Sequence, residues 1–300
     1  MRMTIISALA GLVILSAGVT RAEAQTRPRD RLIVTTTWLA EHLEDEHLVL
    51  LHVGEEYEKE HISGAQPMLL RDISSGYEHE APLTLELMAP EDLRDVLQRF
   101  GVTDASRIVV YFGADWVTAS TRIMFALHAA GLGDRASLLD GGMPAWKAAG
   151  HPVTDVATIP RVGRLSPLHP VSLVVDAVWV QAHKDQPGYA LVDGRAAIFY
   201  DGVRETGAGK GHVAGAGSLP FTEVFDDELR LASPAALEAL LARAGVQPGD
   251  TVVAYCHIGQ QATAAFFAAR SLGYPYRLYD GSMDDWGKRG LPLVTPGEHR

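Results

Sequence analysis

The chain has 300 residues, of which 47% are hydrophobic, and its formal net charge at pH 7 is −11. This length suggests about two domains of ordinary size, and the hydrophobic content argues against large-scale disorder. The negative charge argues against nucleic acid or an anionic membrane as the main partner. A site that binds anions in this chain must therefore create its own local positive field.

The first residues have the pattern of a secretory signal peptide. Arg2 supplies a positive start, residues 5–19 are an apolar stretch, and Ala22 and Ala24 are small residues at the positions that a signal peptidase recognises. The apolar stretch is shorter than the ~20 residues that span a bilayer comfortably. We therefore expect residues 1–24 to be removed and the mature chain to be periplasmic or secreted, with no membrane attachment. An uncleaved anchor is the minor alternative.

The remainder of the chain contains an internal repeat. Five motifs of the first half recur in the second half in the same order, about 140 to 151 residues later. The matched motifs begin at Leu32 and Leu173, Leu50 and Leu191, His61 and His212, Ile108 and Val252, and Leu138 and Leu278. Five matches in the same order indicate a tandem duplication.

Each half alternates short apolar strands with stretches of helical periodicity. Residues 90–100 and 233–244 are two such helical stretches at equivalent places in the two halves. This alternation is typical of a mainly parallel sheet with helices on both faces. We therefore predict an α/β fold with two tandem domains, residues 30–150 and 171–296, joined by a proline-containing linker at 151–170.

Cys256 is the only cysteine of the chain and lies between a predicted strand and a predicted helix that begins at Ala262. Backbone N–H groups and the positive end of the helix dipole converge at such a junction. We expect them to stabilise a thiolate, lower its pKa and make Cys256 a nucleophile. A buried structural cysteine is the alternative, but an unpaired thiol in an exported chain favours a chemical role.

The ordered set of motifs resembles the tandem-domain rhodanese (sulfurtransferase) family, in an exported bacterial form. The resemblance covers residues 31–295 and rests on the strand ending at Asp193, the segment beginning at His212, the Cys256 loop and the Asp-Gly motif before Trp286. It implies an enzyme that takes a sulfane sulfur from a small anionic donor onto Cys256. The resulting persulfide passes its outer sulfur to a thiophilic acceptor such as cyanide or a thiol, without a cofactor.

The two halves differ at the positions that matter for this chemistry. Where the second half has Cys256, Arg195 and Asp193, the first half has Phe112, Gly54 and His52. A phenylalanine cannot act as a nucleophile. We therefore expect the first domain to be an inactive scaffold and the second to be catalytic, the division that two-domain members of the family usually show.

The predicted site comprises Cys256 as catalytic residue and a set of substrate-binding residues, namely Arg195, His257, Ile258, Gly259, Gln260 and Gln261. The resemblance implies that backbone N–H groups of the loop after Cys256 cradle the persulfide, and a buried anion needs such donors. Arg195 is expected to hold the donor, because a guanidinium binds a sulfonate or carboxylate in a bidentate manner. An ion pair of Arg195 with Asp193 or another acid is the alternative, and His257 either assists the thiolate or points to solvent.

The choice of donor is weakly determined by the loop sequence. The loop lacks both the basic residues of thiosulfate-preferring relatives and the serine of mercaptopyruvate-preferring relatives. Positive charge from Arg195 and His257 favours thiosulfate, with 3-mercaptopyruvate as the alternative.

Other classes of function are less favoured. A cysteine-dependent phosphatase or arsenate reductase needs an arginine six residues after the cysteine, and Ala262 stands there. A non-catalytic binding module would not need the Cys256 and Arg195 combination. Scattered histidines and a lone thiol predict no metal site. The sequence does not indicate which oligomeric state the protein has.

Overall fold

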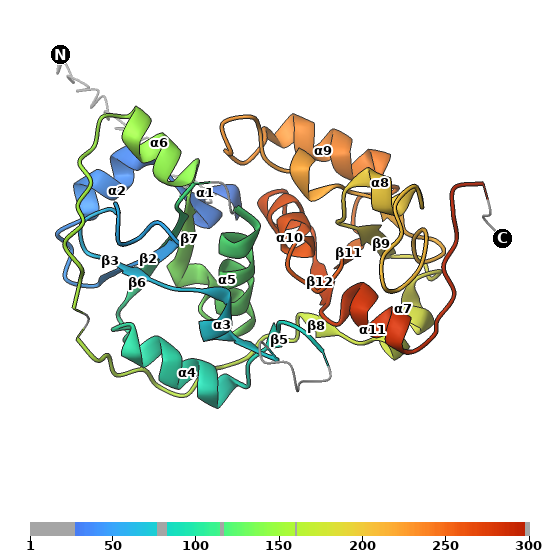
Figure 1. The fold of residues 1–300 in the computed structure, drawn as a ribbon, viewed down its shortest axis with the longest axis horizontal. Coiled ribbons are helices and arrows are strands. Elements are labelled where there is room, and N and C mark those ends of the chain that lie inside the picture. The colour runs from blue at the N-terminus through green and yellow to red at the C-terminus, as the bar shows by residue number, and fades with distance from the viewer. Residues whose placement is uncertain (1–27, 77–82, 115–116, 160, 298–300) are drawn as a thin grey trace, which may run out of the picture.

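The computed structural model describes residues 28–76, 83–114, 117–159 and 161–297. The predicted signal peptide, residues 1–24, lies outside the described residues. Within them the chain forms two lobes, each built around a parallel sheet, with the N-terminal half in one lobe and the C-terminal half in the other (Figure 1). The predicted α/β fold with two tandem domains is therefore confirmed.

The first domain contains a sheet whose described strands are all parallel. These strands are β1 (Ile33–Val34), β2 (Leu48–Val53), β3 (Ala65–Pro67), β6 (Arg107–Phe112) and β7 (Ala136–Leu139), arranged in the order β1-β7-β6-β2-β3. A separate antiparallel pair consists of β4 (Ser74–Ser75) and β5 (Glu86–Leu87). The helices are α1 (Pro28–Leu32), α2 (Thr36–His42), α3 (Leu70–Ile73), α4 (Pro90–Arg99), α5 (Val117–Ala129), the 3-10 helix η1 (Gly133–Arg135) and α6 (Gly142–Ala148).

The second domain repeats this arrangement. Its strands are β8 (Val174–Val175), β9 (Tyr189–Asp193), β10 (Gly217–Ser218), β11 (Thr251–Tyr255) and β12 (Tyr276–Tyr279). Its helices are α7 (Ala177–His183), α8 (Ala197–Tyr200), the 3-10 helix η2 (Phe221–Glu223), α9 (Pro234–Arg243), α10 (Ala262–Ser271) and α11 (Ser282–Lys288). The strand order β8-β12-β11-β9-β10 matches that of the first sheet strand for strand, as a tandem duplication requires.

The elements form where the local sequence favours them. The central strands β2, β6 and β11 are apolar and buried almost throughout, as strands covered on both faces must be. Helices α4 and α9 both begin with proline, which suits a first helical turn, and the Ser233 side chain caps α9 by accepting from the Ala236 N–H. Both helices occupy the stretches predicted to be helical.

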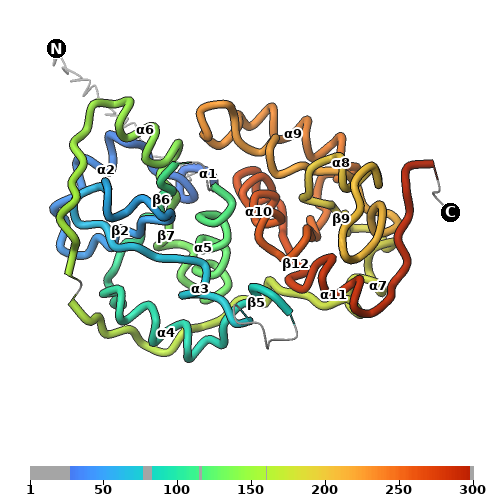
Figure 2. Tube along the Cα trace, in the orientation of Figure 1, coloured from blue at the N-terminus to red at the C-terminus, as the bar shows by residue number. Residues whose placement is uncertain are grey.

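Helices cover both faces of each sheet and create three hydrophobic clusters. One lies under α2 and α6 on the outer face of the first domain, and one under α7 and α11 on the outer face of the second. The third and largest cluster continues from the first domain into the second, because α5 and α10 pack against each other where the lobes meet (Figure 2). At this contact the Phe125 ring meets the Phe266 ring edge to face, with centroids 5.7 Å apart.

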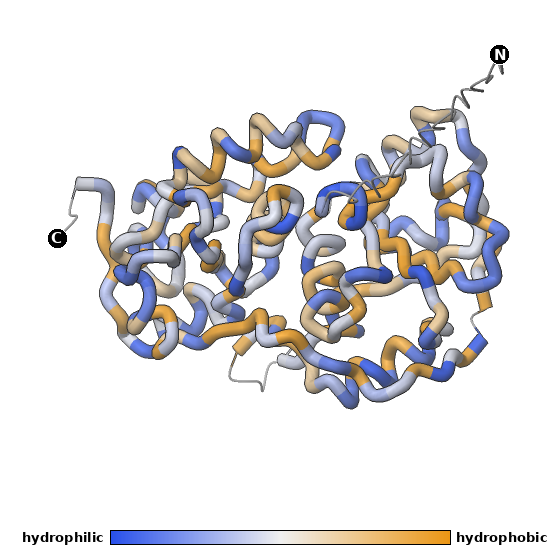
Figure 3. Tube along the Cα trace, turned by 180° about the vertical axis from the view of Figure 1, so that it is seen from behind, coloured by the Kyte–Doolittle hydropathy of each residue, from blue (hydrophilic) through white to orange (hydrophobic). Residues whose placement is uncertain are grey.

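The hydropathy of the chain follows this layering. Seen from behind, hydrophobic segments run through the middle of the N-terminal lobe, where its strands lie, and hydrophilic segments are common in the outer loops (Figure 3). Of residues 151–170, those that the structure describes contain no helix or extended strand; the His61–Thr154 bridge attaches this segment to the first domain. In the described part of the chain no helix has the length and apolar character needed to cross a bilayer.

Two matching Asp-Gly motifs, Asp140-Gly141 and Asp280-Gly281, contribute hydrogen bonds between the domains. The Leu231 N–H of the second domain donates to Asp140 Oδ1 of the first at 2.8 Å. The Leu87 N–H of the first domain donates to Asp280 Oδ2 of the second at 2.9 Å. In each domain, the aspartate that follows the strand next to the sheet edge, β7 or β12, thus accepts a hydrogen bond from a backbone N–H of the other domain.

Candidate active site

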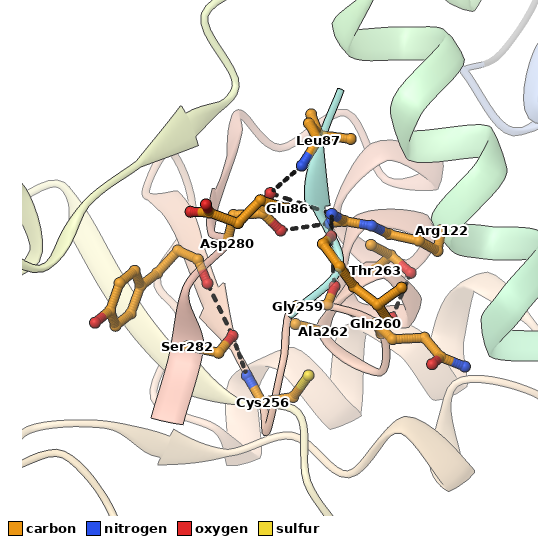
Figure 4. Close-up of polar contacts among 12 residues, drawn as sticks. Glu86, Leu87, Arg122, Cys256, Gly259, Gln260, Ala262, Thr263, Asp280 and Ser282 are labelled. Carbon is orange, nitrogen blue, oxygen red and sulfur yellow. Dashed lines mark hydrogen bonds and ion pairs between the residues drawn. The ribbon is translucent and has the colours of Figure 1, made fainter. Parts of the chain in front are cut away.

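Cys256 follows β11 directly, and α10 begins six residues later at Ala262 (Figure 4). Strand β11 lies in the middle of its sheet, between β9 and β12, and all three strands are parallel. Their carboxyl ends therefore meet around the thiol, at the edge of the sheet where α/β proteins bind ligands. The predicted strand–loop–helix junction at Cys256 is present.

Burial dominates the electrostatics of the Cys256 thiol, which is 0% exposed. Burial raises the pKa of the thiol because a thiolate loses its hydration, while hydrogen bonds from the backbone N–H groups of Ala262, Ile258 and Gln261 lower it. The net pKa lies above the ordinary value. The expectation of a lowered pKa is therefore wrong, although the converging N–H groups on which it rested are present. The loop and helix end replace only part of the solvation that the thiolate loses.

A pocket of about 380 Å³ gives access to this loop. Its lining consists of Thr118, Phe221, Cys256, His257, Ile258, Gln260 and Gln261. Thr118 belongs to α5, so the first domain forms one wall, and Gln260 Nε2 donates to Thr118 Oγ1 at 3.1 Å across the domain boundary. Four of the five predicted loop residues therefore line one pocket with the thiol, and Gly259 lies within the same loop.

Arg195 is fully buried and paired with Asp193. Its Nε donates to Asp193 Oδ1 at 2.9 Å, and its Nη2 donates to Asp193 Oδ2 at 2.6 Å and to the Gly211 carbonyl at 2.7 Å. Burial alone would lower the pKa of Arg195, but its hydrogen bond and charge interaction with Asp193 raise it, with a smaller contribution from Cys256. The structure thus contains the ion pair that was the alternative for Arg195. Donor binding by Arg195 stays a prediction, which depends on Nη1, the guanidinium nitrogen without a hydrogen-bond partner among the described residues.

His257 lines the pocket and packs against Phe199, with ring centroids 4.6 Å apart and nearly perpendicular planes. Burial lowers the pKa of His257, and the charge of Arg195 lowers it further. The ring is therefore neutral at pH 7 and supplies no positive charge to a donor. An exposed cation lies beyond it: the Arg204 guanidinium stacks over the Phe199 ring, 5.5 Å from its centroid.

Ser282 is a site residue that sequence analysis does not identify. The Cys256 N–H donates to Ser282 Oγ at 3.1 Å, and this hydroxyl donates to the Tyr279 carbonyl at 2.9 Å (Figure 4). Ser282 has φ of +50°, a strained backbone conformation for a residue other than glycine. Its hydroxyl therefore fixes the backbone from which the thiol projects.

The first domain shows how Ser282 could have been found. Its counterpart Gly142 has nearly the same backbone conformation, with φ of +52°. A Cβ at Gly142 would lie only 2.6 Å from the Phe112 ring, so the phenylalanine fills the place that the Cys256–Ser282 contact has in the second domain. A serine replaces glycine in the same half in which cysteine replaces phenylalanine, and this paired difference is visible in the sequence.

The polar groups of the first domain do not reproduce the site. His52 is fully buried, and neither ring nitrogen has a hydrogen-bond partner among the described residues. Burial, with a contribution from His61, lowers the pKa of His52 to about 4, so the ring is neutral. In the part of the chain that the structure describes, no group of three or more His, Cys, Asp or Glu side chains could hold a metal ion.

The structure is thus a two-domain α/β protein with one buried thiol, which lies at the carboxyl end of a central parallel strand and accepts hydrogen bonds from backbone N–H groups. The chain belongs to the rhodanese-like family. The rhodanese-like domain matches it twice, over residues 35–149 and 176–289, which lie within the two predicted domains.

Several relatives are named as sulfurtransferases, with different sulfur donors in their names. The chain is 35% identical over 234 residues to a protein of Pseudomonas aeruginosa named "Probable 3-mercaptopyruvate sulfurtransferase", covering 77% of this chain and 82% of that protein. It is 27% identical to the thiosulfate sulfurtransferase of Mus musculus, covering 87% and 94% of the two chains. The crystal structure of the 3-mercaptopyruvate sulfurtransferase SseA from Escherichia coli matches with a TM-score of 0.74 and 25% identity, covering 83% of this chain and 98% of that one. The chain is a sulfurtransferase, as predicted.

Proposed function

We propose that Cys256 is the sulfur-carrying residue of this enzyme. The thiolate attacks the outer sulfur of a donor, a new S–S bond forms, and the bond between that sulfur and the rest of the donor breaks with its electron pair leaving on the donor. The acceptor then attacks the outer sulfur of the persulfide and returns Cys256 as thiolate. The observation that supports this most is the set of N–H groups from Ile258, Gln261 and Ala262 directed at the sulfur.

We propose thiosulfate as the donor, with 3-mercaptopyruvate as the alternative. Relatives bear both names, so the comparisons favour neither. The pocket lining has no Arg or Lys among the described residues, and His257 is neutral. The candidates for holding the anionic end of the donor are therefore the backbone N–H groups of the loop and Nη1 of Arg195, and the exposed Arg204 is the cation that attracts the donor toward His257.

The decisive experiment measures sulfur transfer to cyanide by the wild-type chain and by Cys256→Ser, with thiosulfate and 3-mercaptopyruvate supplied in parallel. Turnover should occur in the wild type and disappear in Cys256→Ser. Intact mass spectrometry after donor treatment should show one added sulfur atom on the wild type alone. Faster turnover with 3-mercaptopyruvate would reverse the choice of donor. Absence of both turnover and added sulfur would leave a non-catalytic binding module as the better explanation.

The pH dependence of sulfur loading follows from the raised pKa of Cys256. Because the thiolate is the nucleophile and its pKa lies above the ordinary value, only a small fraction is ionised at neutral pH. The rate of persulfide formation is therefore expected to rise about tenfold per pH unit from neutrality toward the thiol pKa. Single-turnover mixing with thiosulfate at several pH values checks this. A rate that is constant above pH 7 would show that the thiolate is already formed.

We also propose that the chain is exported. The support is the charged start, the apolar stretch over residues 5–19 and the small residues before Gln25. Expression of the full chain in a bacterium, followed by cell fractionation and N-terminal sequencing, should find the protein outside the cytoplasm with its N-terminus near Gln25. Recovery of the intact N-terminus in the cytoplasm would contradict export.

A further inference from the structure

The first domain sends one fully buried charge to the catalytic loop of the second. Arg122 projects from α5 and is 0% exposed. Its Nη1 donates to Asp280 Oδ1 at 2.5 Å, its Nη2 donates to Asp280 Oδ2 at 3.1 Å, and Nη1 also donates to the Gly259 carbonyl at 3.4 Å (Figure 4). Nη2 has a further acceptor in the Leu85 carbonyl. The guanidinium thus forms a two-point ion pair with one segment and a hydrogen bond with another.

Both of these segments hold the thiol. Gly259 lies in the loop between Cys256 and α10, next to Ile258 and two residues before Gln261, whose N–H groups face the sulfur. Asp280 lies two residues before Ser282, whose hydroxyl accepts a hydrogen bond from the Cys256 N–H. A single side chain of the other domain therefore fixes the two pieces of backbone that determine where the sulfur lies.

The packing around this contact leaves little freedom. Gly259 has φ of +80°, and a Cβ there would be 2.5 Å from Asp280 Oδ1 and 3.3 Å from Arg122 Nη1. Thr118 and Thr121 lie on the same face of α5 as Arg122, and they hydrogen-bond to Gln260 and to Thr263 of α10. One face of α5 is thus hydrogen-bonded along the loop from Gly259 into the first turn of α10.

The two domains are related by pseudo-symmetry, so the Arg122–Asp280 contact can be compared with the equivalent inter-domain contact at Asp140. Asp140, the counterpart of Asp280, also accepts a backbone N–H from the opposite domain. The inter-domain arginine on that side, Arg29, donates to the carbonyls of Leu231 and Ala232, and no arginine forms a bidentate pair with Asp140 among the described residues. The buried bidentate pair therefore occurs on the side that has the nucleophile.

We propose that Arg122, in the domain without a nucleophile, is a positioning residue for sulfur transfer: it holds the Cys256 loop through Gly259 and Asp280 so that the loop N–H groups stay directed at the sulfur. This inference rests on the proposed role of Cys256. It assigns the first domain a part in the reaction beyond covering the pocket. The residue acts through the loop and touches no substrate.

The test uses Arg122→Lys, which keeps the charge but loses the fork that joins Asp280 and Gly259. We expect kcat for sulfur transfer to fall about 10- to 100-fold, because the reacting group is displaced. Cys256 is the only thiol, so alkylation by iodoacetamide reports on it alone. The midpoint of the alkylation rate against pH should move to higher pH, because misdirected N–H groups no longer stabilise the thiolate.

Arg29→Lys is the matched control, since Arg29 also joins the two domains but contacts neither the Cys256 loop nor Asp280 in the structure. It should leave the alkylation profile and kcat unchanged. If Arg122→Lys does not fold, Asp280→Asn, which keeps an oxygen for the Leu87 N–H, should move the profile in the same direction. An unmoved profile with wild-type kcat in a folded Arg122→Lys or Asp280→Asn would overturn the proposal. Because alkylation needs no sulfur donor, failure of the sulfur-carrier role of Cys256 would show instead as missing turnover in the wild type.

Discussion

Gly259→Ala is expected to reduce kcat/KM for sulfur transfer by about 100-fold or more. Gly259 has φ of +80°, and an added Cβ would lie 2.5 Å from Asp280 Oδ1 and 2.8 Å from the Asp280 carbonyl oxygen. The carboxylate is held by Arg122, and the carbonyl oxygen belongs to the backbone at the end of β12. Moving either oxygen away would cost considerable energy. The loop must therefore move instead, together with the N–H groups that face Cys256.

A second glycine separates steric displacement from backbone strain. Gly188 has φ of +87°, and a Cβ there would meet nothing within 4 Å. Gly188→Ala therefore adds about 1–2 kcal/mol of left-handed strain without a clash. It should lower the unfolding temperature and preserve kcat/KM. Steady-state kinetics and thermal unfolding of both variants check this. Full activity in Gly259→Ala, or an equal loss in both, would contradict the steric argument.

The fold was predictable because its signals are local and occur twice. Apolar runs such as residues 108–112 and 252–255 identify buried strands without any three-dimensional information. The ordered repeats then imply that both halves share one topology, and the matching strand orders confirm this. The position of Cys256 between strand and helix followed from the same local patterns. The resemblance of the sequence to rhodaneses predicted sulfur transfer as the reaction, which the names of the relatives support.

The electrostatics of the site could not be predicted in this way. A helix N-terminus after Cys256 is visible in the sequence, but the complete burial that raises the thiol pKa depends on how the folded chain packs around it. The Arg122–Asp280 pair joins residues 158 positions apart, and no local pattern connects them. His257 was one of two candidate sources of positive charge for the donor, but burial together with the nearby Arg195 charge lowers its pKa and makes it neutral. Each of these properties depends on neighbours distant in the chain.

Arg195→Met is expected to lower the free energy of unfolding by about 3–5 kcal/mol, because it leaves the buried Asp193 carboxylate without its counter-charge. The exposed pair of Arg243 with Glu223 provides the control, with side chains 58% and 46% exposed. Arg243→Met should cost less than about 1 kcal/mol. Urea unfolding of the two variants measures this difference. Equal costs would show that the Arg195 pair does not behave as a buried ion pair.

A double variant of Asp193 and Arg195 distinguishes a structural role of Arg195 from a role in donor binding. An apolar pair, Asp193→Leu with Arg195→Met, removes both charges and should recover most of the lost stability, since a buried ion pair is replaceable by apolar residues of similar volume. If Arg195 only supports the fold, this double variant should regain sulfur transfer with a KM for thiosulfate close to the wild-type value. If Nη1 of Arg195 holds the donor, the double variant should fold and yet keep a KM raised at least about tenfold, because the lost charge-assisted hydrogen bond contributes about 1.5–3 kcal/mol. Stability and KM measured on the same protein therefore distinguish the two roles, which a single Arg195 variant would leave combined.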